Sequence, residues 1–178
     1  MFHASSFKKI ATFTLMIMTL FSTTQSQAAT AANSTANWRA FAPQGSGFYA
    51  QFPGQPIKKV NGAITQYHYL EQTPRGNYFY GIAMQTYSYA PADLDKALRA
   101  ECDGYARGFE GQVVRTARTT NNGYTGLLAR VESKTGSSIV AAWYVGNRVY
   151  CVAFATGKTV EMPDEARQFL NSFLLYRS

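Results

Sequence analysis

The sequence predicts an α+β domain in which an antiparallel β-sheet of about six to seven strands is packed by two main helices. Three observations lead to this fold class. Segments with strand-like alternation come in runs, separated by short turns rich in Gly, Asn and Pro. Two segments with helical spacing interrupt these runs, one in the middle of the chain and one near its end. The resulting order of strands, helix, four strands and helix favours antiparallel pairing over a parallel, doubly wound sheet.

The first 28 residues have the three parts of a secretory signal peptide. Lys8 and Lys9 form a basic start, residues 10–21 form an apolar run too short to span a bilayer, and Ser26-Gln27-Ala28 resembles a cleavage site. We expect cleavage after Ala28, with Ala31 as the second choice. The sequence therefore predicts a signal peptide over 1–28, a flexible lead-in over 29–37 and one domain over 38–178. The exported product, periplasmic or secreted, is expected to keep no transmembrane segment.

The first part of the domain is read as strands. A short strand over 47–52 ends at Pro53-Gly54-Gln55-Pro56, which is strong turn chemistry. Residues 63–71 alternate in polarity, and residues 78–89 form a long aromatic segment after the turn sequence TPRGN. We expect these two longer segments to pair with each other.

A helix is expected after Pro91. Its apolar stripe recurs at helical spacing and ends near Gly108 and Gly111; the stripe consists of Leu94, Leu98, Cys102, Tyr105 and Phe109. Two further strands follow over 112–120 and 124–133, separated by the turn Asn121-Asn122-Gly123.

The segment from 138 to 175 organises the rest of the fold. Residues 139–145 and 148–155 form a predicted hairpin around Gly146-Asn147, because glycine accepts the positive φ of a two-residue turn. The second of these strands is apolar on both faces, so it is expected to be central and covered on two sides. Its small face, Val149, Cys151 and Ala153, suits a closely packed helix. A closing helix is expected to begin near Pro163, with an apolar stripe formed by Ala166, Phe169, Leu170 and Phe173.

Three motifs resemble the PsbP-like/DcrB-like superfamily of small exported α+β domains. They are FYAQFPGQP near the start, YVGNRVYCVAF late in the chain and EARQFLNSF at its end. The resemblance covers residues 38–176 and implies a PsbP-like sandwich, an antiparallel sheet packed by helices. It implies no shared active site, because members resemble assembly factors, binding modules or uncharacterised envelope proteins. This chain lacks the lipoprotein cysteine of some bacterial relatives.

The two cysteines are predicted to form a disulfide. Cys102 lies on the stripe of the first helix, and Cys151 lies on the small face of the central strand. Export would place the chain in an oxidising compartment, where an even number of cysteines suggests pairing. The alternative is two separate buried thiols, which behave as small apolar residues.

Tyrosines crowd the two paired strands, and they allow two interpretations. Tyr67, Tyr69, Tyr78 and Tyr80 could form core and cross-strand pairs, or an exposed face that binds a protein or a glycan.

Catalytic and cofactor motifs are not recognisable in the sequence. His68 is the single histidine after the signal peptide, so a Ser–His–Asp triad would have to use it. One histidine and two distant cysteines do not indicate a zinc site, and no phosphate-binding loop is present. We therefore expect no cofactor, no metal and no catalytic residues.

The charge pattern argues against nucleic-acid binding. Removal of residues 1–28 takes away two lysines and lowers the net charge from +7 to +5, and Lys58-Lys59 is the only adjacent basic pair left. The expected function is a non-enzymatic binding or accessory protein of the cell envelope, with a protein or glycan partner. The alternatives are an envelope hydrolase or lyase, and a structural subunit of an envelope complex; the oligomeric state stays open.

Overall fold

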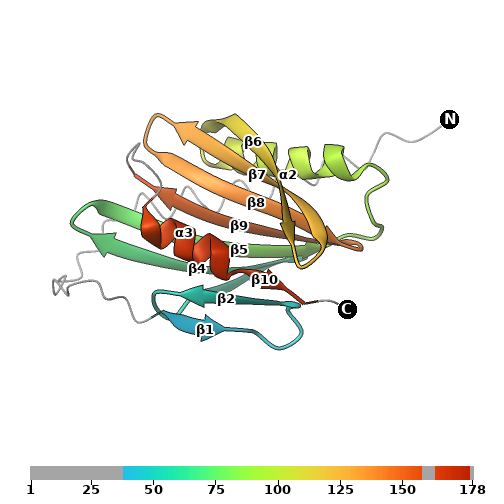
Figure 1. The fold of residues 1–178 in the computed structure, drawn as a ribbon, viewed down its shortest axis with the longest axis horizontal. Helices are drawn as coiled ribbons and strands as arrows, with labels where there is room; N and C mark the ends of the chain where they lie inside the picture. Colours follow the sequence, from blue (N-terminus) through green and yellow to red (C-terminus); the bar gives the residue numbers. More distant parts are fainter. Residues whose placement is uncertain (1–37, 158–162, 177–178) are drawn as a thin grey trace.

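The computed structural model describes residues 38–157 and 163–176, and it contains an α+β fold of antiparallel strands with two helices (Figure 1). Seven strands form one sheet in the order β3-β4-β5-β9-β8-β7-β6, and three short strands form a second sheet, β1-β2-β10. The predicted α+β class of antiparallel strands with two helices is therefore confirmed, and the three-stranded sheet is an addition to the single sheet that the sequence predicts. The predicted signal peptide and lead-in lie outside the described residues.

The strands follow the chain as β1 Arg39–Phe41, β2 Phe48–Phe52, β3 Ile57–Asn61, β4 Ile64–Thr73, β5 Gly76–Thr86, β6 Gly111–Asn121, β7 Tyr124–Ser133, β8 Ser137–Val145, β9 Arg148–Thr156 and β10 Leu174–Leu175. The helices are α2 Leu94–Gly108 and α3 Asp164–Ser172. The sequence missed β3 because lysines at its centre hide any alternation, and it missed β1 and β10 because two or three residues carry no readable period.

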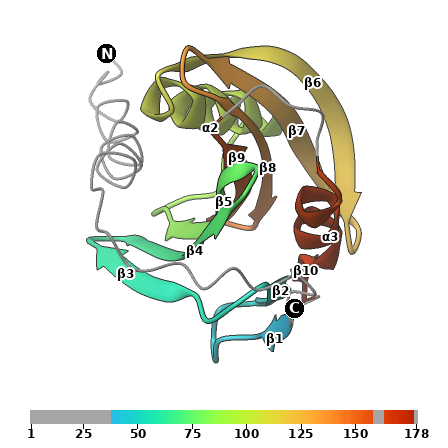
Figure 2. The same ribbon diagram turned by 90° about the vertical axis from the view of Figure 1, so that its left-hand side faces the viewer.

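Strand β9 lies at the centre of the seven-stranded sheet, as its two apolar faces predict. Val149, Cys151 and Ala153 belong to one buried cluster, and Tyr150 and Val152 belong to another on the opposite face. Figure 2 shows the sheet curving strongly, with α2 on one side and α3 with the small sheet on the other. The molecule therefore has two hydrophobic cores separated by one sheet.

The hairpin between β8 and β9 turns where the sequence predicts. Gly146 has a φ of 59°, and the register pairs Val145 with Arg148. Because glycine has no Cβ, this left-handed conformation carries no steric penalty there.

Helix α2 begins with a side-chain cap and is tied to the sheet by a buried hydroxyl pair. The Asp93 side chain accepts a hydrogen bond of 3.0 Å from the Lys96 backbone N–H, which satisfies a free donor of the first turn. Tyr105 is fully buried, and its hydroxyl lies 2.6 Å from that of Ser138 on β8. The helix ends after Gly108 as predicted, although the left-handed residue beyond it is Glu110, with a φ of 50°, and not a glycine.

Helix α3 closes the other core. It begins after Pro163, and its side chains Ala166 and Phe169 are fully buried against β2 and β9. Phe173 lies just past the helix and stacks on Trp143 with ring centroids 5.4 Å apart. The stripe predicted for this helix is therefore the contact surface that covers the second face of the sheet.

Gly126 on β7 provides the space that this arrangement needs. A Cβ at this position would overlap the indole ring of Trp143 on the neighbouring strand. We expect Gly126→Ala to lower the free energy of unfolding by about 1–3 kcal/mol, because Trp143 packed on Phe173 has little room to move. Chemical denaturation measures the loss. Gly157→Ala is the matched control, since the nearest atom to its new Cβ is 4.0 Å away; equal stability of both variants would contradict the prediction.

Candidate functional site

The tyrosines of β4 and β5 lie in the core, so the surface interpretation is wrong for three of the four. Tyr67, Tyr78 and Tyr80 are buried, with Tyr80 at 0% exposure, and Tyr69 is half-buried against the same cluster. The cause is the cover provided by β2 and α3: the ring of Tyr67 contacts Phe48, and that of Tyr80 contacts Phe169. The Tyr80 hydroxyl donates to Glu71 at 2.8 Å, and burial is the main cause that raises its pKa.

His68 also has a structural environment. Its side chain lies on the opposite face of β4, is 5% exposed and stacks on Phe79, with ring centroids 6.1 Å apart and an interplanar angle of 19°. Burial, and then the nearby charge of Lys59, lower the pKa of the imidazole. The neutral ring therefore serves as an aromatic packing partner of Phe79.

The two cysteines lie in the same hydrophobic core as free thiols. Burial raises the pKa of Cys102 to about 12 and raises that of Cys151 well above its usual value. After burial, the nearby charges of Glu101 and then Cys102 are the further causes that raise the pKa of Cys151. The disulfide between them stays a prediction.

A polar cluster lies beside the core that contains these cysteines, and its residues Tyr87 and Tyr144 pack against that core. The Glu101 carboxylate on α2 accepts hydrogen bonds from the hydroxyls of Tyr87 and Tyr144, at 3.0 and 2.7 Å through the same oxygen. The two rings stack with centroids 6.2 Å apart. Burial and the Glu101 charge both raise the pKa values of the two hydroxyls. This cluster joins α2 to the end of β5 and to β8. Both tyrosine hydroxyls donate their proton to the same carboxylate oxygen.

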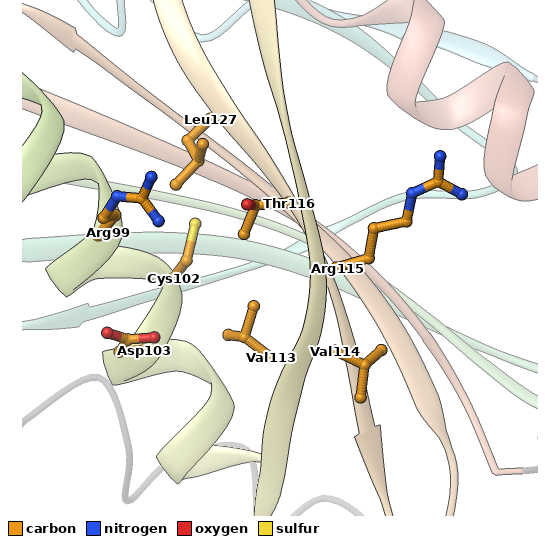
Figure 3. Close-up of a pocket in the computed structure, with 8 residues that line it drawn as sticks. All are labelled: Arg99, Cys102, Asp103, Val113, Val114, Arg115, Thr116 and Leu127. Carbon is orange, nitrogen blue, oxygen red and sulfur yellow. The ribbon is translucent and has the colours of Figure 1, made fainter.

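A cleft of about 360 Å³ lies between α2 and the edge strand β6 (Figure 3). The residues that line it form an apolar floor and a charged rim; they are Arg99, Cys102, Asp103, Val113, Val114, Arg115, Thr116 and Leu127. Figure 3 shows the side chains of Arg99, Cys102 and Thr116 between helix and strand, whereas Arg115 points to the other side of β6. Because β6 is the last strand of the seven-stranded sheet, the cleft lies at the edge of that sheet.

A β-bulge shapes this edge. Val113 pairs with Val131, but the next residue of β7, Arg130, pairs with Arg115, so Val114 is an extra residue of β6. A bulge bends its strand and re-aims the side chains around it. Val114 is accordingly 52% exposed, which is unusual for a valine in a sheet.

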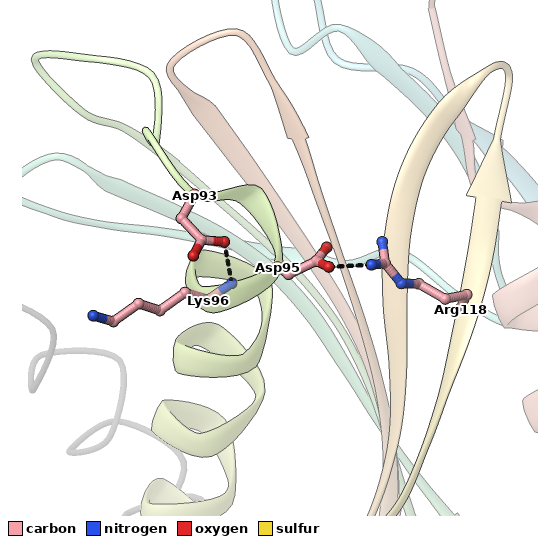
Figure 4. A network of polar contacts seen from close by, with 4 residues as sticks. All are labelled: Asp93, Asp95, Lys96 and Arg118. Atoms are coloured by element: carbon pink, nitrogen blue, oxygen red, sulfur yellow. Dashed lines mark hydrogen bonds and ion pairs between the residues drawn. The ribbon is translucent and has the colours of Figure 1, made fainter.

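An exposed ion pair joins the first turn of α2 to β6. Asp95 in the first turn of α2 pairs with Arg118 of β6, next to the cap formed by Asp93 (Figure 4). This pair and the buried Tyr105 fix the helix at two places along β6 and β8. The cleft is therefore bounded by anchored elements.

The sequence contains a signal for the bulge beside this cleft, although not for the cleft itself. The doubled valine at 113–114 breaks the alternation of the segment 112–120, which is what an inserted strand residue does. Arg99 and Asp103, by contrast, look like ordinary solvent residues of an amphipathic helix, and only the packing of α2 beside β6 brings them to the cleft.

The Glu101 cluster generates a stability prediction. Glu101→Leu leaves two half-buried hydroxyls without their acceptor, so we expect it to lower the free energy of unfolding by about 2–4 kcal/mol. Glu101→Gln keeps an acceptor oxygen and is expected to lose less than half of that. Urea denaturation of both variants measures the difference, and equal losses would show that the shared acceptor does not matter.

Comparison with known proteins does not place the chain in a family. No family model and no curated protein matches it. A crystal structure of a protein from Bacteroides thetaiotaomicron VPI-5482 is similar at 12% identity and a TM-score of 0.41, over 78% of this chain and 48% of that protein. The chain thus spans about half the length of that neighbour, and similarity at this level identifies neither a family nor a function.

Proposed function

We propose that this protein is an exported, non-enzymatic binding protein of the cell envelope that takes its ligand in the cleft between α2 and β6. The cleft itself is the observation that carries the proposal. Its floor of Cys102, Val113 and Leu127 offers apolar contact, and Arg99 at the rim offers a cation. Ligand sites in proteins combine apolar walls with a few placed polar groups in this way.

The sequence supports the location that we propose. The basic start, short apolar run and Ser26-Gln27-Ala28 are the basis for export. Within the part of the chain that the structure describes, neither helix has the length and apolar character needed to cross a membrane. Membership of the PsbP-like/DcrB-like superfamily is also part of the proposal. It is supported by the sequence FPGQP, which begins at the last residue of β2, by the β8–β9 hairpin and by the closing helix α3.

Export also underlies the proposed disulfide between Cys102 and Cys151. The bridge would close a loop of about 50 residues and stabilise the fold by roughly 4 kcal/mol through the entropy of the unfolded chain. Mass spectrometry of the exported protein without reductant is expected to find a product lighter by two hydrogens that resists alkylation after denaturation. Two alkylatable thiols under these conditions would contradict the bridge and leave the cysteines as packed thiols.

Octanoate is a suitable probe of the cleft, because it joins an apolar tail to a single carboxylate. We expect it to shift the NMR signals of Val113, Thr116 and Leu127. Thr116→Trp, which fills the cleft, is expected to weaken binding by about tenfold or more. Thr120→Trp on the same strand is its matched control.

Arg99→Glu should weaken binding, and Arg107→Glu in the last turn of the same helix should not.

A titration in which octanoate leaves the cleft signals unchanged would count against the cleft as the ligand site. Equal affinity of the Thr116 and Thr120 variants would do the same.

A further inference from the structure

We propose that the natural ligand of this cleft is an extended, acidic segment of a partner polypeptide, which adds to β6 as a further strand of the sheet. The proposal rests on the binding function proposed above and names the class of ligand. Peptide recognition by strand addition needs an open sheet edge for main-chain hydrogen bonds and a neighbouring pocket for side chains. The edge at β6 has both.

The first step concerns the backbone of β6. This strand ends the seven-stranded sheet, and among the described residues its outer edge pairs with no strand. Asn122 and Gly123, with φ values of 48° and 89°, form the two-residue turn to β7, so the closing pair of Asn121 and Tyr124 is hydrogen-bonded. Hydrogen bonding alternates along an antiparallel pair. The backbone groups of Thr120, Arg118 and Thr116 therefore point outward, toward the position of an added strand.

The second step concerns the pocket. Val114 and Thr116 of this edge strand both line the cleft, and the bulge at Val114 leaves about half of that apolar side chain exposed there. Side chains of an added strand alternate in direction. Every second side chain would therefore point toward the α2 side of the sheet, where one apolar residue can enter the cleft.

The third step concerns charge. Strand β6 carries Arg115 and Arg118 and no acidic residue, and Arg99 of α2 lies at the cleft rim. Arg115 lies opposite Arg130 of β7. The repulsion between these like charges is reduced because Arg130 forms an ion pair with Glu132 at 3.0 Å. Arg118 is occupied by Asp95, and Asp103 is the acidic residue of the rim. Arg99 and Arg115 thus remain, on either side of β6, to contact carboxylates of a partner.

The same arginines argue against a second copy of this chain as the occupant. Charged side chains and bulges are devices by which edge strands avoid pairing with one another. Two copies of β6 would each bring Arg115 and Arg118, and no acidic residue of that strand, to the shared edge, and like charges brought close across paired strands are unfavourable. An acidic strand turns this repulsion into attraction, so the edge selects its partner by charge.

The test uses the full exported chain and a fluorescein-labelled heptapeptide of alternating Glu and Val, with Glu at both ends. We expect fluorescence anisotropy to report binding that is lost with the corresponding Lys and Val peptide and is much weaker with polyglutamate. Hydrogen exchange by NMR should show new protection at the amides of Thr116 and Arg118. These amides have no strand partner among the described residues, so their protection reports strand addition directly.

Matched proline variants separate strand addition from simple charge attraction. Thr116→Pro removes one outward N–H at the cleft and is expected to weaken peptide binding by about tenfold. Val60→Pro makes the same change at an outward position of β3, the opposite edge, and should leave binding unchanged. Melting temperatures confirm that both variants are folded.

Each of the following results would overturn the proposal. Equal binding of the peptide by both proline variants, or by polyglutamate, would reduce the effect to charge. Octanoate binding in the cleft without peptide binding would refute strand addition and leave the proposed function standing. Sedimentation showing a dimer that the peptide does not dissociate would assign the edge to a second copy. Failure of octanoate and peptide alike would remove the proposed function as well.

Discussion

Burial of β9 on both faces is the constraint on which the rest of the structure depends. A strand with one apolar face can lie on a single core. Strand β9 has two apolar faces that must both be removed from water, one formed by Tyr150 and Val152 and the other by Val149 and Cys151. Two covering layers are then required. Helix α2 supplies one, and α3 with β2 supplies the other, so the two helices lie on opposite faces of one curved sheet (Figure 2).

The candidate cleft is a consequence of this layered construction. Helix α2 packs against β6, β7 and β8 and is joined to the sheet through Asp95 and Tyr105. A helix is straight, whereas the sheet curves and β6 bends further at Val114. The two surfaces therefore diverge beside the bulge, and the space between them forms the cleft at the open edge of the sheet.

The two cores differ in composition, although tyrosine hydroxyls are hydrogen-bonded in both; in the second core Tyr80 donates to Glu71 and Tyr150 donates to the Ser46 carbonyl. In the core under α2, the tyrosine hydroxyls form hydrogen bonds with Ser138 and Glu101. The other core is mainly aromatic, with edge-to-face and tilted contacts around Phe48 and Tyr80. Aromatic pairs add to the stability that area burial alone provides. The tyrosines of β4 and β5 thus serve the fold, which explains why their density in the sequence does not indicate a binding surface.

The sequence by itself determined the fold class, the central hairpin, both helices and the pairing of β4 with β5, because these depend on local periodicity and turn chemistry. Only the tertiary structure decided which tyrosines are buried, since alternation marks the faces of a strand without telling which face another layer covers. It also decided that Arg99, Val114 and Thr116 share one cleft. These residues belong to two elements whose juxtaposition depends on how α2 docks, and no local pattern encodes that contact.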